Sequence, residues 1–128
     1  MNYDIKILIV EDLLTTRLFL RRTLKKLGYT NVVLSPDGEA ALEELGRSSF
    51  DLIISDWHMP KMDGLDFFKA LSKNPKWHDI PFLLITAEKE REKVIEAVQA
   101  GIKQYLVKPV EPEKLSNKIK QVVFGGAA

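Results

Sequence analysis

The chain has 128 residues, which is the size of one ordinary domain, and its 45% hydrophobic and 29% charged residues are typical of a globular protein. The formal net charge of +1 predicts no overall attraction to nucleic acid or to an anionic membrane. Cysteine is absent, which excludes disulfides, thiolate metal sites and cysteine nucleophiles. No apolar run approaches the roughly 18 residues of a membrane span, and the N-terminus lacks the features of a signal peptide. We therefore expect a cytoplasmic protein.

Five short apolar runs have the length and composition of buried strands. They are rich in Ile, Val and Leu, and the first, third and fourth show no polar alternation. Such continuous runs are typical of parallel sheets, whose strands are covered on both faces. The predicted strands are residues 5–10, 32–34, 52–54, 82–85 and 105–107.

Helical spacing fills the segments between these runs. Apolar residues recur at the intervals of one helix face in three of these segments. These stripes are Leu20, Leu24 and Leu27; Val94, Ile95 and Val98; and Leu115, Ile119 and Val122. The mixed-charge residues 88–93 predict an exposed start of one helix.

Capping and breaking residues agree with these helices. Asp37 and Asp63 are predicted N-caps, and Pro112 suits a first helical position. Gly28 and Gly101 lie where helices are expected to end. Strand and helix thus alternate five times, and right-handed crossovers would place helices on both faces of a parallel sheet. We predict an α/β, doubly wound, three-layer fold as a single domain over residues 1–128, with a core at about 5–123 and a flexible tail at 124–128.

Polar side chains follow four of the predicted strands. Glu11 and Asp12 come after the first, Asp56 after the third, Thr86 after the fourth and Lys108 after the fifth. Each alone has an ordinary explanation, such as a helix cap, a strand end or a solvated lysine. Parallel strands share one carboxyl edge, however, and ligands of doubly wound sheets bind there. Together these residues predict a functional site.

The residue types indicate phosphoryl chemistry. Crowded carboxylates repel one another and favour a cation, and an all-oxygen set suits Mg²⁺, with Mn²⁺ as an alternative. Asp56, in the middle of the array, is the candidate nucleophile for an aspartyl phosphate. Lys108, Thr86 and the backbone N–H of Ala87 would neutralise charge on the transferred group.

This constellation, completed by Pro109 after Lys108, resembles the receiver domain of response regulators in two-component signalling. The stretch DWHMPKMDG at residues 56–64 closely matches that family's loop after the phosphoacceptor. The resemblance extends from residue 6 to about 123. Within the family the chain is most similar to single-domain chemotaxis regulators, on the basis of Trp57, Tyr105 and residues 87–88 and 99–101. The flavodoxin-like strand order 2-1-3-4-5 is inherited from this resemblance and not deduced from the sequence.

The resemblance implies a role for each site residue. Asp12 and Asp56 would ligate the metal directly, the backbone carbonyl of His58 would be a third ligand, and Glu11 would act through water. Lys108, joined to Pro109 by a cis peptide, would bind a phosphoryl oxygen. The switch would consist of Thr86 and Tyr105.

The resemblance also implies partners. A sensor histidine kinase or histidine phosphotransfer protein would donate the phosphoryl group. A downstream target would dock on the fourth and fifth helices and the last strand, and the phosphoprotein would then dephosphorylate itself. The chain would be a stoichiometric phosphoacceptor and not an enzyme, and a monomer, with dimerisation on phosphorylation as an alternative.

Several alternatives stay open at this stage. The His58 side chain either faces solvent or assists water attack or metal binding, and Tyr105 is either a switch or core filling. Trp57 is expected to be partly exposed beside the site. The basic residues of the first helix form either a solvated face or a docking surface for an acidic patch of a kinase; they are Arg21, Arg22, Lys25 and Lys26. Rival functions are an unphosphorylated pseudo-receiver or flavodoxin-like binding module, and a hydrolase of the aspartyl-phosphate type.

Overall fold

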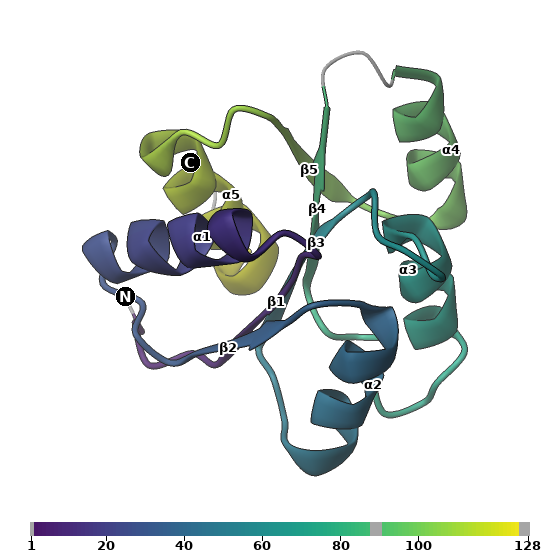
Figure 1. The fold of residues 1–128 in the computed structure, drawn as a ribbon, viewed down its shortest axis with the longest axis horizontal. Coiled ribbons are helices and arrows are strands. Elements are labelled where there is room, and N and C mark those ends of the chain that lie inside the picture. Colours follow the sequence, from purple (N-terminus) through teal and green to yellow (C-terminus); the bar gives the residue numbers. More distant parts are fainter. Residues whose placement is uncertain (1, 88–90, 126–128) are drawn as a thin grey trace.

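The computed structural model describes residues 2–87 and 91–125, and in these ranges five strands alternate with five helices (Figure 1). The strands are β1 (Ile7–Val10), β2 (Val32–Ser35), β3 (Leu52–Asp56), β4 (Phe82–Thr86) and β5 (Gln104–Val107). The helices are α1 (Leu14–Lys26), α2 (Gly38–Arg47), α3 (Gly64–Ser72), α4 (Arg91–Ala100) and α5 (Pro112–Phe124). Within the described residues, no helix combines the length and apolar character needed to cross a membrane.

The strands form one parallel sheet in the order β2-β1-β3-β4-β5, which confirms the inherited order. Successive side chains of a strand point to opposite faces, so each strand supplies two cores. Ile7 and Ile9 of β1 pack with α1 and α5, whereas Leu8 and Val10 pack with α2, α3 and α4. Figure 1 shows the resulting three layers, with α1 and α5 on one face and α2, α3 and α4 on the other. Both faces are covered, which explains the continuous apolar runs in β1, β3 and β4.

The predicted stripes of α1 and α5 cover the sheet. Leu20 and Leu24, and likewise Leu115 and Ile119, are buried in the same core. The α4 stripe predicts the helix correctly but not its buried face. Ile95 and Val98 are 59% and 51% exposed, whereas Ala97 is buried. The small side chain of Ala97 is the part of α4 that enters the core, and two large apolar side chains of the helix stay on the outside.

The strands begin or end at residues other than those of the predicted apolar runs, because backbone hydrogen bonds define the strands. The ladder of β1 begins at Ile7 and not at residue 5, because the N–H of Lys6 donates to the Asp51 carboxylate at 2.8 Å. At the other edge β3 and β4 run one or two residues further than predicted, to Asp56 and Thr86. These polar residues interrupt the apolar pattern but not the ladder, which joins backbone atoms.

The predicted caps and helix ends are confirmed. The side chains of Asp37 and Asp63 each accept a backbone N–H bond of 2.8 Å in the first turn of their helices. Gly28 and Gly101 have φ of +104° and +112°, a region that favours glycine, and α5 starts at Pro112.

The predicted flexible tail at 124–128 and the predicted exposed helix start at 88–93 are described only in part. Phe124 ends α5 and Gly125 caps it in the left-handed conformation, whereas residues 126–128 of the expected tail lie outside the described residues. Of the predicted helix start at 88–93, residues 88–90 also lie outside the described residues. The helix begins at Arg91, and the side chains of Glu92 and Lys93 are exposed.

Gly64, the first residue of α3, fixes the loop after β3. Its N–H donates to the carbonyl of Trp57 at 2.7 Å. A Cβ atom at this position would lie 2.4 Å from the backbone oxygen of Asp56. The close approach of α3 to the strand end therefore requires glycine, and it holds the loop folded back beside Asp56.

We predict that Gly64→Ala lowers the free energy of unfolding by more than about 2 kcal/mol, since the clashing atom is backbone and has to move. Urea denaturation followed by circular dichroism measures this change. The control is Gly46→Ala in α2, where an added Cβ would have no atom within 4 Å. There the better helix propensity of alanine is expected to stabilise the protein by roughly 0.5–1 kcal/mol. Equal effects of the two substitutions would contradict the close approach.

Candidate metal centre

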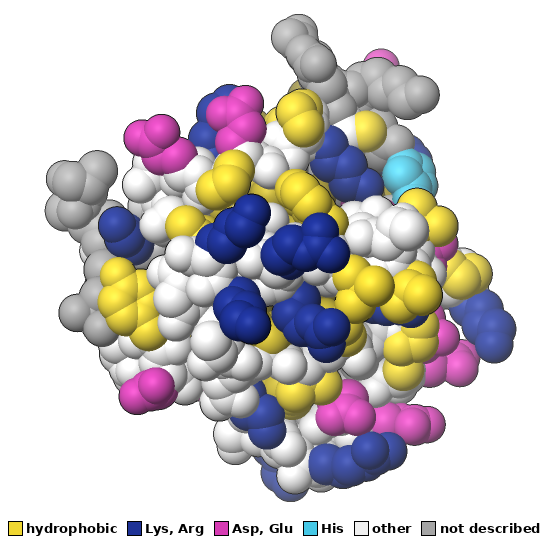
Figure 2. Space-filling view, turned by 60° about the vertical axis from the view of Figure 1, so that its left-hand side comes forward, with side chains coloured by type: hydrophobic (Ala, Val, Ile, Leu, Met, Phe, Trp, Pro, Cys, Tyr) yellow, Lys and Arg dark blue, Asp and Glu magenta, His cyan; other side chains and the backbone are white. Residues whose placement is uncertain are grey.

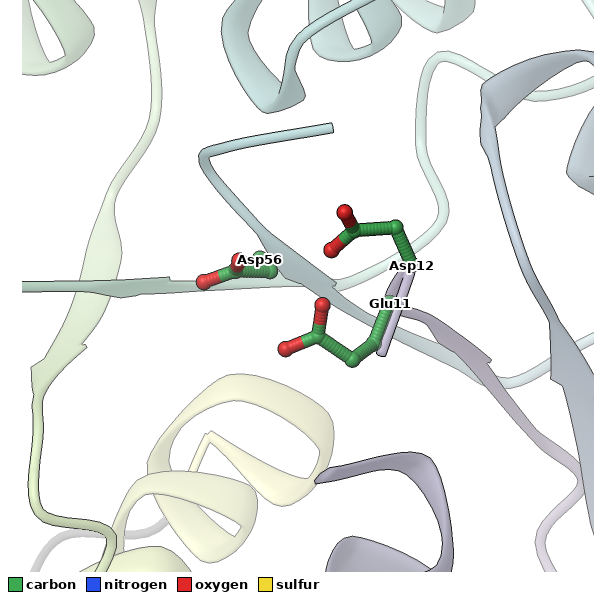
Figure 3. Close-up of side chains that lie close together, drawn as sticks. All are labelled: Glu11, Asp12 and Asp56. Carbon is green, nitrogen blue, oxygen red and sulfur yellow. The ribbon is translucent and has the colours of Figure 1, made fainter. Parts of the chain in front are cut away.

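Three carboxylates lie together at the carboxyl edge of the sheet. Glu11 and Asp12 directly follow β1, and Asp56 is the last residue of the neighbouring strand β3. The register pairs Val10 with Ser55, so the residues that follow this pair meet at the strand ends. One ligand oxygen from each side chain lies within 4.8 Å of the others. Figure 3 shows the three carboxylates grouped at the two strand ends.

Burial makes this cluster electrostatically unfavourable when it is fully ionised. Glu11 is 1% exposed and Asp56 is 7% exposed, whereas Asp12 faces solvent. Burial, a hydrogen bond with Asp12 and the charge of Asp56 raise the pKa of Glu11 to about 7. The N–H of Leu13 opposes this rise and donates to Glu11 Oε2 at 3.3 Å. A group of oxygen ligands that retains a proton near neutral pH fits a hard cation such as Mg²⁺.

Lys108 provides the positive charge of the site. Its Nζ lies 3.0 Å from Oδ1 of Asp56. The residue follows β5, its N–H donates to the Thr86 carbonyl at 2.8 Å, and its peptide bond to Pro109 is cis. The ion pair places the amine at the end of β3, so Asp56 has acids on one side and an ammonium on the other.

Thr86 ends β4 on the side of Asp56 that faces Lys108. Asp56 pairs with Ile85, so Thr86 lies one residue beyond Asp56 on the adjacent strand. Thr86 is 1% exposed, and the next residue, Ala87, lines a groove on the surface beside the site. The hydroxyl and the following backbone are therefore close to the acidic cluster without belonging to it.

The loop after β3 differs in one respect from the expectation. Trp57 was expected to be partly exposed, but it is buried in the core beneath α2, α3 and α4. Its carbonyl accepts the Gly64 N–H, which draws the loop and the indole inward. Lys93 Nζ of α4 lies 5.9 Å from the centre of the Trp57 ring. The side chain of His58 is exposed, and its backbone follows directly on the acidic site.

A groove of about 650 Å³ adjoins the site between α4 and α5. Ala87 and Lys108 line its inner end, and its walls include Val94, Ile95 and Tyr105. Tyr105 is 36% exposed, which contradicts the alternative that it is plain core filling. This groove thus extends from Lys108 of the acidic site to the exposed apolar side chain of Ile95 on α4.

Sequence reasoning missed Arg17. Its side chain donates hydrogen bonds to the backbone carbonyls of Glu11 and Asp12 at 2.7 and 3.0 Å. The signal available was an arginine five and six residues after the acidic pair, about one helical turn into α1. The other basic residues of this helix are exposed and form no comparable contact among the hydrogen bonds described.

A family model and curated relatives match this chain over most of its length. The model of the response regulator receiver domain matches residues 7–120. The chain is 40% identical over 117 residues to chemotaxis protein CheY of Pseudomonas aeruginosa, covering 91% of this chain and 94% of that protein. It is 39% identical over 122 residues to chemotaxis protein CheY-3 of Vibrio cholerae, covering 95% and 94%.

Solved structures agree with this match. Chemotaxis protein CheY4 of Vibrio cholerae superposes with a TM-score of 0.85 at 36% identity, covering 93% of this chain and 98% of that chain. The receiver domain of sensor histidine kinase PA1611 from Pseudomonas aeruginosa superposes with a TM-score of 0.85 at 26% identity, covering 94% and 98%. That structure is described with a magnesium ion coordinated in the active site cleft.

The raised pKa of Glu11 predicts that the metal-free protein loses stability as the pH rises. Below pH 4.5 Glu11 is protonated whether the chain is folded or unfolded, and above about pH 7 it is ionised in both. Between these values the folded protein holds a proton that the unfolded chain has lost, so the free energy of unfolding falls with rising pH. We expect a loss on the order of 2–3 kcal/mol from this group, measured by urea denaturation in EDTA.

Glu11→Gln isolates this contribution because the amide imitates the protonated acid. The variant and the wild type should have similar stability near pH 4.5, and the variant should be the more stable protein above pH 7. Parallel pH curves for the two proteins would mean that Glu11 has an ordinary pKa and that the acidic cluster is not strained.

Proposed function

We propose that this chain, which belongs to the response regulator receiver domain family, accepts a phosphoryl group on Asp56 and uses it to switch a protein-binding surface. The observation that carries this proposal is the position of Asp56. It is the one residue that belongs both to the acidic cluster and to the ion pair with Lys108. A nucleophilic carboxylate for phosphoryl transfer needs both environments, a metal-binding side and a cationic side.

These contacts support the following reaction. An oxygen of the Asp56 carboxylate attacks the phosphorus of a phosphohistidine, the P–N bond breaks, and the imidazole leaves with the bonding electron pair. Lys108, 3.0 Å from the carboxylate, would neutralise charge on the phosphoryl oxygens, and Thr86 at the end of β4 and the N–H of the following Ala87 are further donors. Charge-assisted hydrogen bonds are stronger than neutral ones, and the burial of Asp56 and Thr86 strengthens them further.

The residues present fit a magnesium ion. The metal would be held by Asp12 and Asp56, by the His58 backbone carbonyl, and by Glu11 through water. Once bound, it would neutralise the carboxylates and the phosphate oxygens during transfer. The raised pKa of Glu11 supports this assignment, since a divalent ion would replace the retained proton.

The groove beside the site is the proposed output surface. Its inner end is formed by Ala87 and Lys108, and its outer part by Ile95 and Tyr105. Movement of Thr86 and Lys108 towards a phosphoryl group would change the inner end, and Tyr105 can adjust because it is only partly buried. A target protein would bind over α4, β5 and α5.

Because Asp56 is the single proposed acceptor, each chain would carry one phosphoryl group at a time. Water would then attack the aspartyl phosphate and restore Asp56. The exposed His58 side chain follows directly on this site, where it could assist the attacking water. The rival hydrolase function would need a capping segment, and every connection between elements is short in the described residues. A pseudo-receiver has no need of the pairing of Lys108 with Asp56.

We predict that acetyl phosphate with Mg²⁺ adds one PO₃ group per chain and that Asp56→Asn abolishes the addition. Intact-mass spectrometry followed by peptide mapping measures this, and EDTA should prevent it. The matched control is Asp66→Asn, an exposed aspartate of α3, which should be phosphorylated as the wild type is. No adduct on the wild type would favour the pseudo-receiver, and steady hydrolysis of phosphomonoesters would favour the hydrolase.

The donor protein is proposed to meet the basic face of α1. Helix α1 carries Arg21, Arg22, Lys25 and Lys26 and no acidic residue, and all four side chains are exposed. Figure 2 shows Lys and Arg side chains gathered in the middle of this side of the molecule, with hydrophobic side chains beside them. The α1 N-terminus adjoins the acidic site, so an acidic donor surface placed here would bring its phosphohistidine close to Asp56.

We predict that Arg21→Glu with Arg22→Glu slows phosphotransfer from the donor protein at least tenfold at low salt but leaves phosphorylation by acetyl phosphate unchanged. Repulsion between like charges lowers the association rate, and added salt should reduce the difference from the wild type. Radiolabel transfer from the purified donor measures the rates. Equal rates for the two proteins would mean that this face is only solvated.

A further inference from the structure

The contacts of Arg17 give it a role that its charge alone does not explain. Arg17 lies in the first turns of α1, and its side chain is half-buried. One nitrogen, Nη1, donates to the carbonyl oxygen of Glu11 at 2.7 Å and to that of Asp12 at 3.0 Å. A single planar group therefore bridges the backbone of both residues whose side chains form the acidic cluster with Asp56.

Helix α1 lacks the usual means of fixing this loop. The residue at its N-cap position is Leu13, whose side chain makes no capping hydrogen bond, and its first turn contains no acidic residue. The loop of Glu11 and Asp12 is held on its other side by the Glu11 N–H, which donates to the Ser35 carbonyl of β2 at 3.0 Å. Arg17 thus ties to α1 a loop that is otherwise anchored to the sheet.

Fixing the backbone also fixes the carboxylates. The Asp12 side chain is exposed, and once Glu11 and Asp56 are both ionised their charges would turn it towards solvent. Its backbone carbonyl is held by Arg17, and its carboxylate stays within 4.8 Å of the other two ligand atoms. The ion pairs of the described residues include none with Arg17, so its charge acts on the loop through the carbonyls.

We infer that Arg17 is a positioning residue of the metal centre: it clamps the Glu11–Asp12 backbone so that both carboxylates face Asp56, and it thereby sets the affinity for Mg²⁺. The inference rests on the proposed metal site. It assigns Arg17 to the arrangement of the ligands and not to contact with the metal or the phosphoryl group.

The test is Mg²⁺ titration of the metal-free protein, followed by tryptophan fluorescence and by isothermal titration calorimetry at constant ionic strength. Arg17→Met should weaken Mg²⁺ binding by about tenfold. This is the lower end of the loss in metal affinity that follows mutation of residues that orient metal ligands. Arg17→Lys keeps the charge, but its shorter side chain does not bring an N–H donor to the position of Nη1 between the two carbonyls, so it should also weaken binding. The control is Arg47→Met, which removes an exposed arginine of α2 paired only with Glu43 and Glu44 in the described contacts.

Two further readouts separate positioning from folding. Unfolding in EDTA should show that both Arg17 variants are folded at the temperature of the titration. In acetyl phosphate reactions the Mg²⁺ concentration for half-maximal rate should rise about tenfold, whereas the rate at saturating Mg²⁺ should stay near that of the wild type.

The following results would overturn the inference. Wild-type affinity in Arg17→Met would exclude the clamp, and wild-type affinity in Arg17→Lys alone would mean that charge and not geometry matters. An equal loss in Arg47→Met would indicate a general charge effect. Absence of Mg²⁺ binding by the wild type itself would overturn the proposed metal site together with the inference, so the two failures are distinguishable.

Discussion

Asp56 is held between charges of opposite sign in a space that excludes most of the solvent. Glu11 and Asp12 lie on one side and the Lys108 amine on the other, 3.0 Å away. Burial and the neighbouring acids raise the energy of the ionised cluster, as the pKa of about 7 for Glu11 indicates, while the lysine lowers it. Neither effect would be large in water, because a high dielectric weakens both. Burial at the sheet edge is therefore what turns three common carboxylates into a site that favours a divalent cation.

The fold serves this arrangement through one property of parallel sheets. All carboxyl ends lie at one edge, so residues far apart in the chain meet without a dedicated loop. Asp56 and Thr86 are strand residues, held by the ladder itself, and Gly64 brings α3 against the backbone of Asp56. Glu11 and Asp12, by contrast, lie just beyond β1. Their positions depend on local contacts such as those of Arg17, so the acidic pair is the part of the site that the sheet fixes least.

The parts of the structure that were predictable from sequence are those governed by local rules. Apolar runs, the Asp37 and Asp63 caps and the positive-φ glycines each depend on one segment, and all are found as expected. Strand order came from family resemblance, since no local pattern encodes it. The errors concern tertiary packing. Trp57 is buried because Gly64 pulls its loop inward, and Ile95 is exposed because Ala97 faces the sheet instead. Arg17 was missed since its partners are carbonyl oxygens, which every residue carries.

The ion pair of Lys108 with Asp56 also limits how strongly phosphorylation can switch the proposed output surface. Shifting a two-state equilibrium from 1:99 to 99:1 requires about 5.5 kcal/mol of differential interaction. New charge-assisted hydrogen bonds from Thr86 and Lys108 would contribute roughly 1.5–3 kcal/mol each. Lys108 already contacts the Asp56 carboxylate before any phosphoryl group arrives, so its contribution is only a difference between two bonded states. If the proposed switch operates, the phosphoryl group alone would therefore shift the groove part of the way, and a target that binds the switched form would have to supply the rest. On this reasoning target and phosphate stabilise each other's bound state, because coupling between two sites is reciprocal.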